Sequence, residues 1–472
     1  MRHPATRLLL TFGLVLSLAT GAMSGEGGID NSLLQKYQKQ LTAEGDQAAT
    51  INAITNNDIK DLSLNREKLI HHDKLLSHKL DLTGMTNQKS SGRCWLFAGA
   101  NVMSPAVKSK LDLPDFEMSQ PYLTFFDKLE KANLFLERMI ALRDRPIDDR
   151  SLCQELDYLF GDGGWFHYFT DLVLKYGVVP LAAMPETKQS TSTGNFNKLS
   201  KTILRKHTAE LRRMHVDGKD VGQLRSRKDE MLGDIYKLLV YNYGTPPVEF
   251  TYRYEAEVDS VKTIVEKQYT PMSFFDEFWG DDFPEYVALV NNPTIDYDQL
   301  FKLEESRNVY ENPDFEVLNL TIDKLKEYTL AALLDSQAVW FSCDVGKDNY
   351  NDSGIFAVDV YDYNRTFDMD FKMTKADRIS FNDISPNHAM VICGVDTATC
   401  GTPTKWLVKN SWGTKNGDDG IWYMYDDWFD EYVLLVMIDK KLLSEEDQDK
   451  FKQKPVTIAD WQPFFLALRN LD

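Results

Sequence analysis

One cysteine stands in a local sequence that can turn its thiol into a nucleophile. Gly92 interrupts regular structure just before Cys94, and the apolar run that begins at Trp95 predicts a helix from about that point. A cysteine in the first turn of a helix lies at the positive end of the helix dipole, which stabilises the thiolate relative to the thiol. Cys94 is therefore a candidate nucleophile; on this segment alone, a cysteine that simply packs at a helix start is the alternative.

A thiolate nucleophile needs a basic partner, and a third group has to hold that partner in place. Of the eight histidines, His388 is best placed, because it opens an apolar run that is typical of a strand. A second predicted strand, residues 406–409, leads into Asn410, and pairing of the two strands would bring Asn410 beside His388. The Asn410 amide oxygen can then accept the imidazole N–H, and Trp412 can shield that bond from water. Taken alone, His388 also fits a core histidine with satisfied hydrogen bonds.

The cysteines show no pattern of a metal site or a disulfide scaffold. Their number, five, leaves at least one thiol unpaired within the chain. Their spacing forms no CxxC pair, no histidine stands at ligand spacing from any of them, and their density is low for a disulfide scaffold. Cys343 and Cys393 lie inside apolar runs, which favours small buried hydrophobic residues. We expect no metal site.

The composition favours a folded chain with a sizeable core. The 472 residues are 43% hydrophobic and 12% aromatic, which is far too apolar for a disordered protein. After the first two dozen residues, no apolar run approaches the roughly 18 residues that a membrane helix needs. The 53 basic and 72 acidic residues give a net charge of −19. That charge disfavours a nucleic-acid partner, because phosphate contacts need clustered cations.

The N-terminus has the pattern of an export signal. Arg2 and Arg7 supply positive charge, residues 8–19 form an apolar run, and small residues at Ala22 and Ser24 suit a signal peptidase. The run is too short to span a bilayer, which disfavours a retained anchor, and a buried N-terminal helix is the other alternative. We therefore predict that residues 1–24 are a signal peptide and that the protein is exported, either periplasmic or secreted.

The rest of the chain divides into segments of different pattern. Residues 25–80 are polar with scattered leucines, like an arm with one or two helices, and residues 81–190 are helical with glycine punctuation. Residues 191–335 are rich in charge with apolar residues at helical spacing, which predicts a mostly helical insertion. Residues 336–455 alternate short β-like runs with Gly, Asn and Asp turns, and residues 456–472 form a tail.

Three segments resemble, in the same order, the catalytic segments of papain-like cysteine peptidases. The surroundings of Cys94 resemble their nucleophile segment, and residues 387–389 and 410–413 resemble their histidine and asparagine segments. His388 follows Cys94 by 294 positions, about twice the roughly 130–150 typical of the papain group, so the resemblance requires a large insertion. The run at residues 86–97 narrows the resemblance to the family of bleomycin hydrolase, also called aminopeptidase C. Further similar segments are residues 119–123, 162–165, 175–180 and 343–347 and the tail from Trp461.

This resemblance implies an α+β, papain-like fold. Residues 81–190 would be the helical subdomain with the nucleophile, and residues 336–455 would be an antiparallel β-barrel-like subdomain with the histidine and the asparagine. The large, mostly helical insertion (191–335) and the N-terminal arm (25–80) would be additions to that fold. Residues 456–472 would be a C-terminal arm that enters the cleft.

The resemblance also implies a role for each site residue. Cys94 would be the nucleophile, His388 its acid–base partner, and Asn410 the group that orients the imidazole. Gln88 would donate its side-chain amide to the oxyanion beside the Cys94 backbone N–H, which agrees with the need for a neutral donor near the sulfur. No metal or organic cofactor is needed for this chemistry.

Two further features of the resembled family concern the substrate. Gly163 and Gly164 resemble the pair whose backbone binds substrate next to the scissile residue, and a glycine turn that caps a helix is the alternative. In the family, the carboxylate that ends the C-terminal arm faces the free ammonium of the substrate, which gives aminopeptidase action. Asp472 would supply that carboxylate here, although the tail after Trp461 is longer and bulkier than the usual ending.

The function predicted on this basis is a thiol-dependent aminopeptidase that hydrolyses N-terminal residues of peptides through a thioester acyl-enzyme. The resemblance also implies a homo-oligomer, a hexameric ring. An endopeptidase or dipeptidyl-type peptidase is the alternative if the tail does not cap the cleft, and a thiol acyltransferase would share the same residues. A non-catalytic exported scaffold is disfavoured, because it has no need of Gln88, Cys94, His388 and Asn410 together.

Overall fold

The chain consists of two units, which are described separately. The computed structural model describes residues 27–43, 47–82, 84–113, 116–157, 159–258, 261–459 and residue 462. The first unit is Met1–Leu64 and the second is Asn65–Asp472. The predicted signal peptide, residues 1–24, lies outside the described residues.

The first unit contains short polar helices, α1 (Asn31–Ala43), α2 (Ala48–Asn56) and α3 (Ile59–Ser63). Asp58 caps α3, because its Oδ1 accepts a hydrogen bond from the Lys60 amide at 2.8 Å. Such caps satisfy backbone donors that the start of a helix leaves open. Most of the unit's described side chains are exposed. The end of the predicted arm belongs to the second unit, which includes α4 (Arg66–Ile70) and β1 (His78–Lys79).

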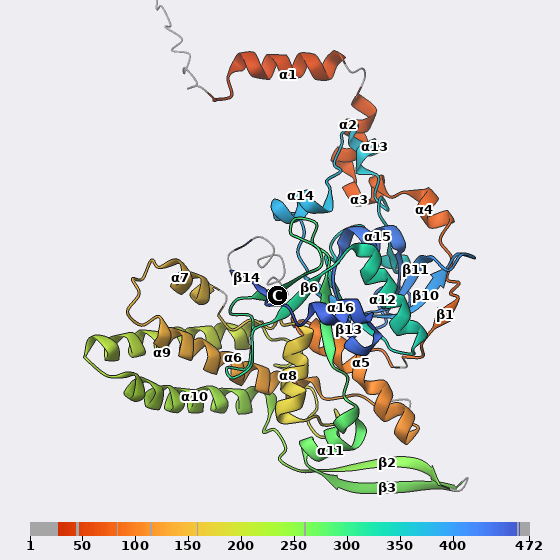
Figure 1. Ribbon diagram of the computed structural model, residues 1–472. Helices are drawn as coiled ribbons and strands as arrows, with labels where there is room; N and C mark the ends of the chain where they lie inside the picture. The colour runs from red at the N-terminus through yellow and green to blue at the C-terminus, as the bar shows by residue number, and fades with distance from the viewer. Residues whose placement is uncertain are drawn as a thin grey trace, which may run out of the picture. The chain divides into compact units, whose positions relative to one another are not determined.

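The helical part of the second unit is built around helices α5 (Cys94–Leu111) and α6 (Gln120–Ala141). Helix α5 packs against α6 and α8 (Phe166–Tyr176). Helices α9 (Gly194–Val216) and α10 (Val221–Tyr243) pack on α6 and form a lobe to one side, at the left of Figure 1. The α10 start carries a capping box, in which Asp220 and Gln223 bond each other's backbone amides.

A long mixed sheet forms the other part of the second unit. Among the described residues it has twelve strands, most of them antiparallel to their neighbours, and β1 pairs with β10 outside the main path. The strands in spatial order are β14 (Val456–Ile458), β5 (Gln299–Leu303), β6 (Glu316–Asn319), β4 (Tyr286–Val290), β13 (Val433–Asp439), β7 (Val339–Cys343), β10 (His388–Thr397), β11 (Pro403–Lys409), β12 (Ile421–Tyr425), β9 (Ile355–Phe356) and β8 (Asn349–Tyr350).

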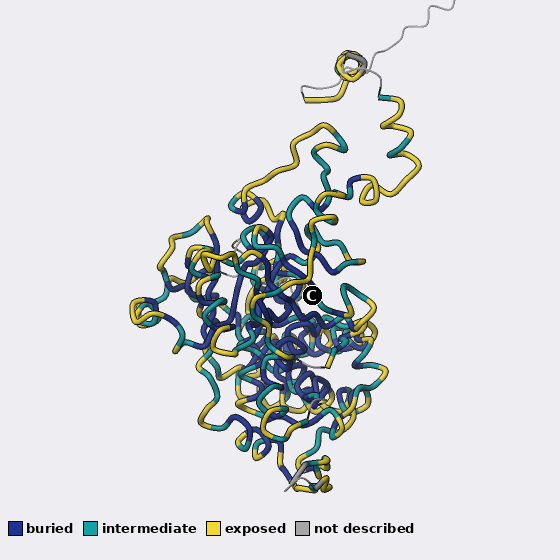
Figure 2. Tube along the Cα trace, turned by 90° about the vertical axis from the view of Figure 1, so that its right-hand side faces the viewer, coloured by how far each residue is buried: buried dark blue, intermediate teal, exposed yellow. Residues whose placement is uncertain are grey.

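The central strands of this sheet are buried on both faces. Successive side chains of a strand point to opposite faces, and in β10 Ala389 and Val391 belong to the core that contains α5. Met390 and Ile392 belong to a second core with α12 (Ile322–Leu334). The buried parts of the trace gather accordingly around the sheet and the helices beside it (Figure 2). The apolar run after His388 is therefore explained by burial on two sides.

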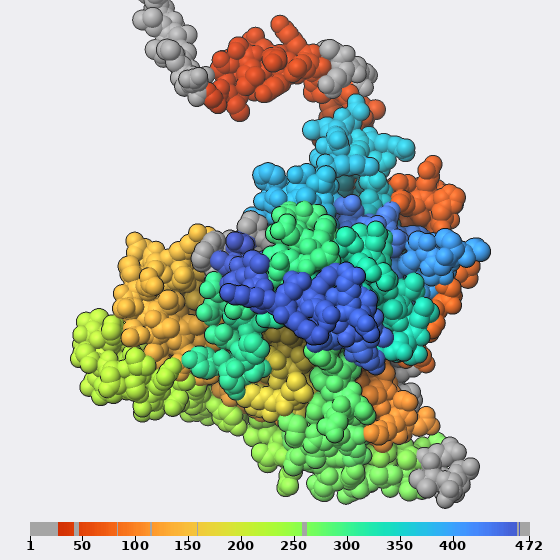
Figure 3. Space-filling view, in the orientation of Figure 1, coloured from red at the N-terminus to blue at the C-terminus, as the bar shows by residue number. Residues whose placement is uncertain are grey.

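The predicted insertion, residues 191–335, contains more strand than expected. Helices α9, α10 and α12 agree with the prediction, but β2 (Phe250–Val258) and β3 (Val261–Tyr269) form an antiparallel hairpin, and β4, β5 and β6 join the main sheet. The hairpin lies at the edge of the unit beside α11 (Pro271–Phe278), as Figures 1 and 3 show. Short apolar runs such as β4 cannot be distinguished from helical segments by periodicity, and the high charge of the segment concealed the alternation.

The remaining α-helices of the second unit are short. They are α7 (Arg150–Asp157), α13 (Tyr363–Phe367), α14 (Lys375–Ser380), α15 (Asp426–Tyr432) and α16 (Glu445–Lys450). Helix α7 lies between α6 and α8, and the others lie between strands. No helix in the described ranges is both long enough and apolar enough to cross a membrane.

Candidate active site

Cys94 is the first residue of α5, which agrees with the helix start that the sequence predicted. Its side chain is buried, with 2% exposure. The amides of Leu96 and Phe97 donate to the Arg93 carbonyl at 3.0 and 3.1 Å, so the first helical turn closes on the residue before the cysteine. The Arg93 guanidinium is fixed by Glu186 at 3.1 Å. The thiol therefore lies at the positive end of a helix of 18 residues.

His388 begins β10, and β10 pairs with β11, as the sequence predicted; the pair is antiparallel. This pairing brings His388 Nε2 to 2.8 Å from Asn410 Oδ1. The carbonyl oxygen of an amide only accepts, so Nε2 carries the proton, and Nδ1 is left as the basic nitrogen of the ring. The Trp412 ring lies 4.7 Å from the imidazole at an angle of 30° and covers this pair.

Cys94 lies close to the start of β10. Helix α5 packs on both β7 and β10. In that strand pair Cys343 stands opposite His388, and its Sγ is 3.9 Å from the His388 carbonyl oxygen. Burial raises the pKa of the Cys343 thiol well above its ordinary value, and the nearby charges of Asp344 and Cys94 raise it further. Cys343 is thus the small buried residue that its apolar run predicted. The start of α5 reaches the same strand pair, because Trp340 Nε1 of β7 donates to the Trp95 carbonyl at 3.2 Å.

Gln88 is fixed against the segment that follows Asn410. Its backbone N–H donates to the Ser411 carbonyl at 2.8 Å, and its Oε1 accepts from Ser411 Oγ at 2.7 Å. Its Nε2 donates to the Ser91 carbonyl at 2.6 Å. An amide nitrogen carries two protons, so one N–H of Gln88 remains available to a further acceptor. Sequence reasoning did not select Ser411, whose hydroxyl holds the Gln88 amide in this orientation.

Asp162 is a second residue that sequence reasoning did not select. Its Oδ2 accepts from the Gly92 amide at 3.0 Å, and its carbonyl oxygen accepts from Trp95 Nε1 at 2.8 Å. Its Oδ1 forms an ion pair with Lys128 Nζ at 2.8 Å, and the Lys128 side chain has no exposure at all. Burial acts to raise the pKa of Asp162, but the charge and hydrogen bonds of Lys128 and bonds from Thr193 and Asn197 hold it well below its usual range. Asp162 thus anchors Gly92, which precedes the nucleophile segment's cysteine, and Trp95, which follows it.

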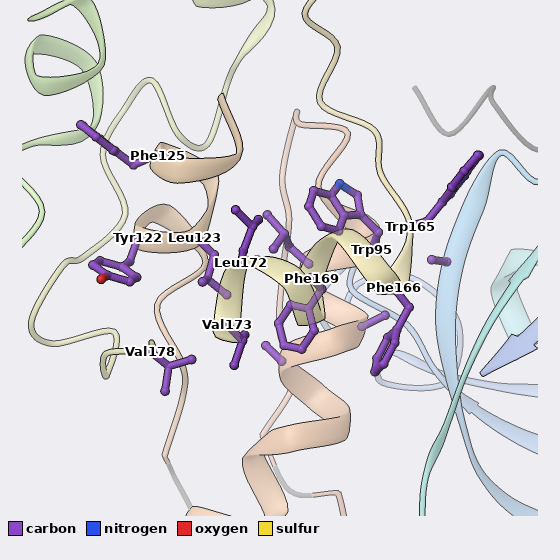
Figure 4. Packing of buried hydrophobic residues seen from close by; sticks show 14 of the residues in the cluster. Trp95, Tyr122, Leu123, Phe125, Trp165, Phe166, Phe169, Leu172, Val173 and Val178 are labelled. Atoms are coloured by element: carbon purple, nitrogen blue, oxygen red, sulfur yellow. The ribbon is translucent and has the colours of Figure 1, made fainter. Parts of the chain in front are cut away.

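Gly163 and Gly164 follow Asp162 and pass directly beside the helix of the nucleophile. A Cβ on Gly164 would stand 2.6 Å from Trp95 Cε2, so no larger residue fits there without displacing the indole. The Gly163 carbonyl accepts from Lys131 Nζ at 2.6 Å. Tyr168 of helix α8, which starts after Trp165, meets the Trp95 ring edge-on at 6.1 Å, and Phe166 and Phe169 of the same helix belong to the same core (Figure 4). Gly164 is therefore required by close packing against Trp95.

Asp344, a buried carboxylate, holds Asn387, the residue before His388. Asn387 Nδ2 donates to Asp344 Oδ1 at 2.7 Å, and Asn387 Oδ1 accepts from the Val345 amide at 3.0 Å. Asp344 Oδ2 also accepts from the Ser385 amide at 3.3 Å. These bonds fix the approach of the chain to His388. Their only signal in the sequence is an Asn directly before the His.

The predicted substrate contact of Asp472 lies outside the described residues. The chain before it is anchored by β14, which pairs parallel to β5 at the edge of the sheet. None of the five cysteines forms a disulfide; Cys153 and Cys400 are exposed and the other three are buried. Within the described ranges no group of three or more His, Cys, Asp or Glu side chains could hold a metal ion.

Comparison with known proteins gives concordant matches over nearly the whole chain. Residues 28–465 match the profile of the Peptidase C1-like family. Aminopeptidase C of Lactobacillus helveticus is 35% identical over 444 residues, which cover 92% of this chain and 97% of that protein. Aminopeptidase C of Listeria monocytogenes is 36% identical over 432 residues, which cover 91% of this chain and 97% of that protein.

The solved structures include one that matches in both fold and sequence. The crystal structure of PepW from Lactobacillus rhamnosis aligns with a TM-score of 0.89 and 35% identity, over 93% of this chain and 99% of that chain. This match confirms the predicted α+β, papain-like fold class. The similarity to aminopeptidase C that residues 86–97 suggested is confirmed as well.

Proposed function

Because this chain belongs to the Peptidase C1-like family, we propose that it is a thiol aminopeptidase that removes N-terminal residues from peptides. The observation that carries the proposal is the hydrogen bond of 2.8 Å between His388 Nε2 and Asn410 Oδ1 beside the start of α5. It orients a neutral imidazole and leaves its Nδ1 as the proton acceptor, which nucleophilic catalysis by a thiol requires.

In the proposed reaction, Cys94 gives its proton to His388 and its sulfur attacks the carbonyl carbon of the first peptide bond. The oxyanion that forms accepts hydrogen bonds from the Cys94 backbone N–H and from the remaining N–H of Gln88. His388 then returns the proton to the leaving amine, and the C–N bond breaks to give a thioester. A water molecule, deprotonated by His388, hydrolyses the thioester and restores the thiol.

Substrate binding in this proposal uses the glycine pair and the tail. The backbone of Gly163 and Gly164 would bind the residue next to the scissile bond, since their lack of side chains lets a peptide approach. The Asp472 carboxylate would pair with the substrate ammonium, and such a charge pair in a closed cleft selects free N-termini.

We also propose that the chain is exported after removal of residues 1–24, in line with the charge and apolar run of that segment. A homohexamer with its active sites facing an internal chamber is likewise proposed. Its support is the family resemblance of the whole mature chain. Gel filtration with light scattering and N-terminal sequencing of the mature protein test these two proposals.

The test of the aminopeptidase proposal is hydrolysis of fluorogenic aminoacyl amides by the chain from residue 25 under reducing conditions. Each substrate is offered with a free and with an acetylated amino group. We expect cleavage of the free-amine substrates and at least a 100-fold lower kcat/KM for the acetylated ones, about 3 kcal/mol of discrimination by one charge pair. Equal cleavage of both sets would contradict the aminopeptidase proposal and favour an endopeptidase or a dipeptidyl-type peptidase.

The pH dependence of this activity follows from the burial of His388. Burial lowers the pKa of His388 to about 4, and the hydrogen bond to Asn410 offsets only part of that effect. A protonated imidazole cannot accept the thiol proton, so we expect kcat/KM to persist as the pH falls through 6.5 and to be lost near pH 4. A pH profile of kcat/KM measures this, with circular dichroism at each pH as the control for unfolding. An acidic limb centred at 6.5 in folded protein would contradict it.

A further inference from the structure

A separate cavity lies along the later turns of α5, from Ala100 to Lys108, and not at the first turn that carries Cys94. It has a volume of about 210 Å³ and is lined by Leu82, residues 84–86, one face of α5, Phe116, Glu117, Gln120 and the last residue of β11. A single water needs only about 10–15 Å³ by a comparable measure, so the cavity is large enough for a small organic molecule. It does not include any of the residues assigned above to catalysis.

The lining carries charges of both signs. Lys409 is 3% exposed, and its Nζ donates to the Leu82 carbonyl at 3.1 Å. The Lys108 ammonium lies close to Gly84 at the cavity wall: a Cβ added to Gly84 would be 3.6 Å from Lys108 Nζ. Glu117 lines the same space. Burial raises the pKa of Glu117, and the charges of both lysines act against that rise.

Gln120 adds a buried acceptor to this lining. Its side chain is 1% exposed, and its Nε2 donates to Glu117 Oε1 at 3.3 Å. No residue that the structure describes donates to Gln120 Oε1. That oxygen is closed to solvent, so Gln120 contributes to the cavity wall through its hydrogen bond to Glu117, which fixes the carboxylate there.

We propose that this cavity binds a small α-amino acid in its zwitterionic form. The ligand carboxylate pairs with the ammonium groups of Lys108 and Lys409, and the ligand ammonium donates to Glu117. The volume restricts the ligand to a short side chain. Such a ligand is of the chemical class that the proposed aminopeptidase releases, but its binding here does not depend on that activity.

The cavity shares segments with the catalytic residues. Thr86, which lines it, accepts from Asn101 Nδ2 at 3.2 Å through its hydroxyl and from the Gly413 amide at 3.0 Å through its carbonyl. Thr86 stands two residues before Gln88, and Lys409 stands directly before Asn410. An amino acid bound here therefore holds together the two segments that carry the oxyanion donor and the orienting amide, and stabilises the folded enzyme.

Isothermal titration of L-alanine into the full chain, with its cleft thiol first blocked by iodoacetamide, tests the proposal. We expect saturable binding with a dissociation constant on the order of 1 mM, and at least about tenfold weaker binding of acetate and of ethylammonium, which carry one charge each. We expect a rise in the thermal midpoint with L-alanine as the second readout.

Two variants locate the binding. Lys108→Gln and Glu117→Gln, both at half-buried positions, are expected to weaken L-alanine binding at least about tenfold, since each removes one charge pair. The exposed Lys198→Gln is the matched control and should bind as the wild type does. Absence of saturable binding, equal binding of acetate, or unchanged binding in both cavity variants would overturn the proposal. Because the thiol is blocked throughout, none of these results bears on the proposed peptidase activity.

Discussion

Replacement of Cys94 by alanine should reduce kcat/KM for aminoacyl amides by at least about 10⁴-fold, to the limit of detection. The substitution removes the sulfur that forms the thioester, and no other thiol among the described residues stands at a helix start beside His388. The cost to folding should be small, because the side chain loses one atom at the edge of the core. Steady-state kinetics of the purified variant, with circular dichroism to verify folding, measures this.

Cys400→Ala is the matched control for this prediction. Cys400 is an exposed thiol, and its pKa is lowered by hydrogen bonds from Thr402, so it is the other cysteine with a tendency to form a thiolate. Its removal should leave kcat/KM unchanged. Activity that survives in Cys94→Ala but disappears in Cys400→Ala would show that the nucleophile has been misassigned.

The second large effect concerns stability. Asp162→Asn should lower the free energy of unfolding by about 3–5 kcal/mol, because it leaves the fully buried ammonium of Lys128 without its counter-charge. The carboxylate has a pKa far below its unfolded value. Its stabilising effect is therefore fully present above about pH 4 and is lost as the pH falls through the folded pKa. Urea denaturation at neutral pH, followed by tryptophan fluorescence, measures the loss.

The control is the same substitution in an exposed ion pair. Asp427 lies 3.4 Å from Lys68 and is 48% exposed, so Asp427→Asn should cost at most about 1 kcal/mol. If Asp162→Asn does not fold, the double variant with Lys128→Met should recover part of the loss, since it removes the buried charge together with its partner. Equal midpoints for Asp162→Asn and Asp427→Asn would contradict the role given to Asp162.

The sequence predicted those parts of the site that depend on local patterns. The glycine before Cys94 and the apolar run after it predicted the start of α5, and two neighbouring apolar runs predicted the pairing that brings Asn410 to His388. The α+β class followed from the resemblance of the same segments. Each of these features is encoded in residues close together along the chain.

The groups that position the site could not be predicted in the same way. Asp162 is 70 residues from Gly92, which it binds, and Ser411 is 323 residues from Gln88. Such contacts depend on tertiary packing, which no periodicity records. The strands β4 to β6 were missed for a related reason, because their short apolar runs become strands only by pairing in the completed sheet, where β4 lies between β13 and β6, and β5 lies beside β6.

Stoichiometric alkylation with peptide mapping shows whether Cys94 is the nucleophile. The full chain is treated with less than one equivalent of iodoacetamide at mildly acidic pH, and residual activity is compared with the alkylated fraction of each cysteine by mass spectrometry. Exposure alone favours reaction at Cys153 and Cys400 over the buried Cys94. We expect activity to fall in proportion to alkylation of Cys94 and to be independent of alkylation of the two exposed thiols. Loss of activity with Cys94 unmodified, or full activity with Cys94 alkylated, would contradict this expectation.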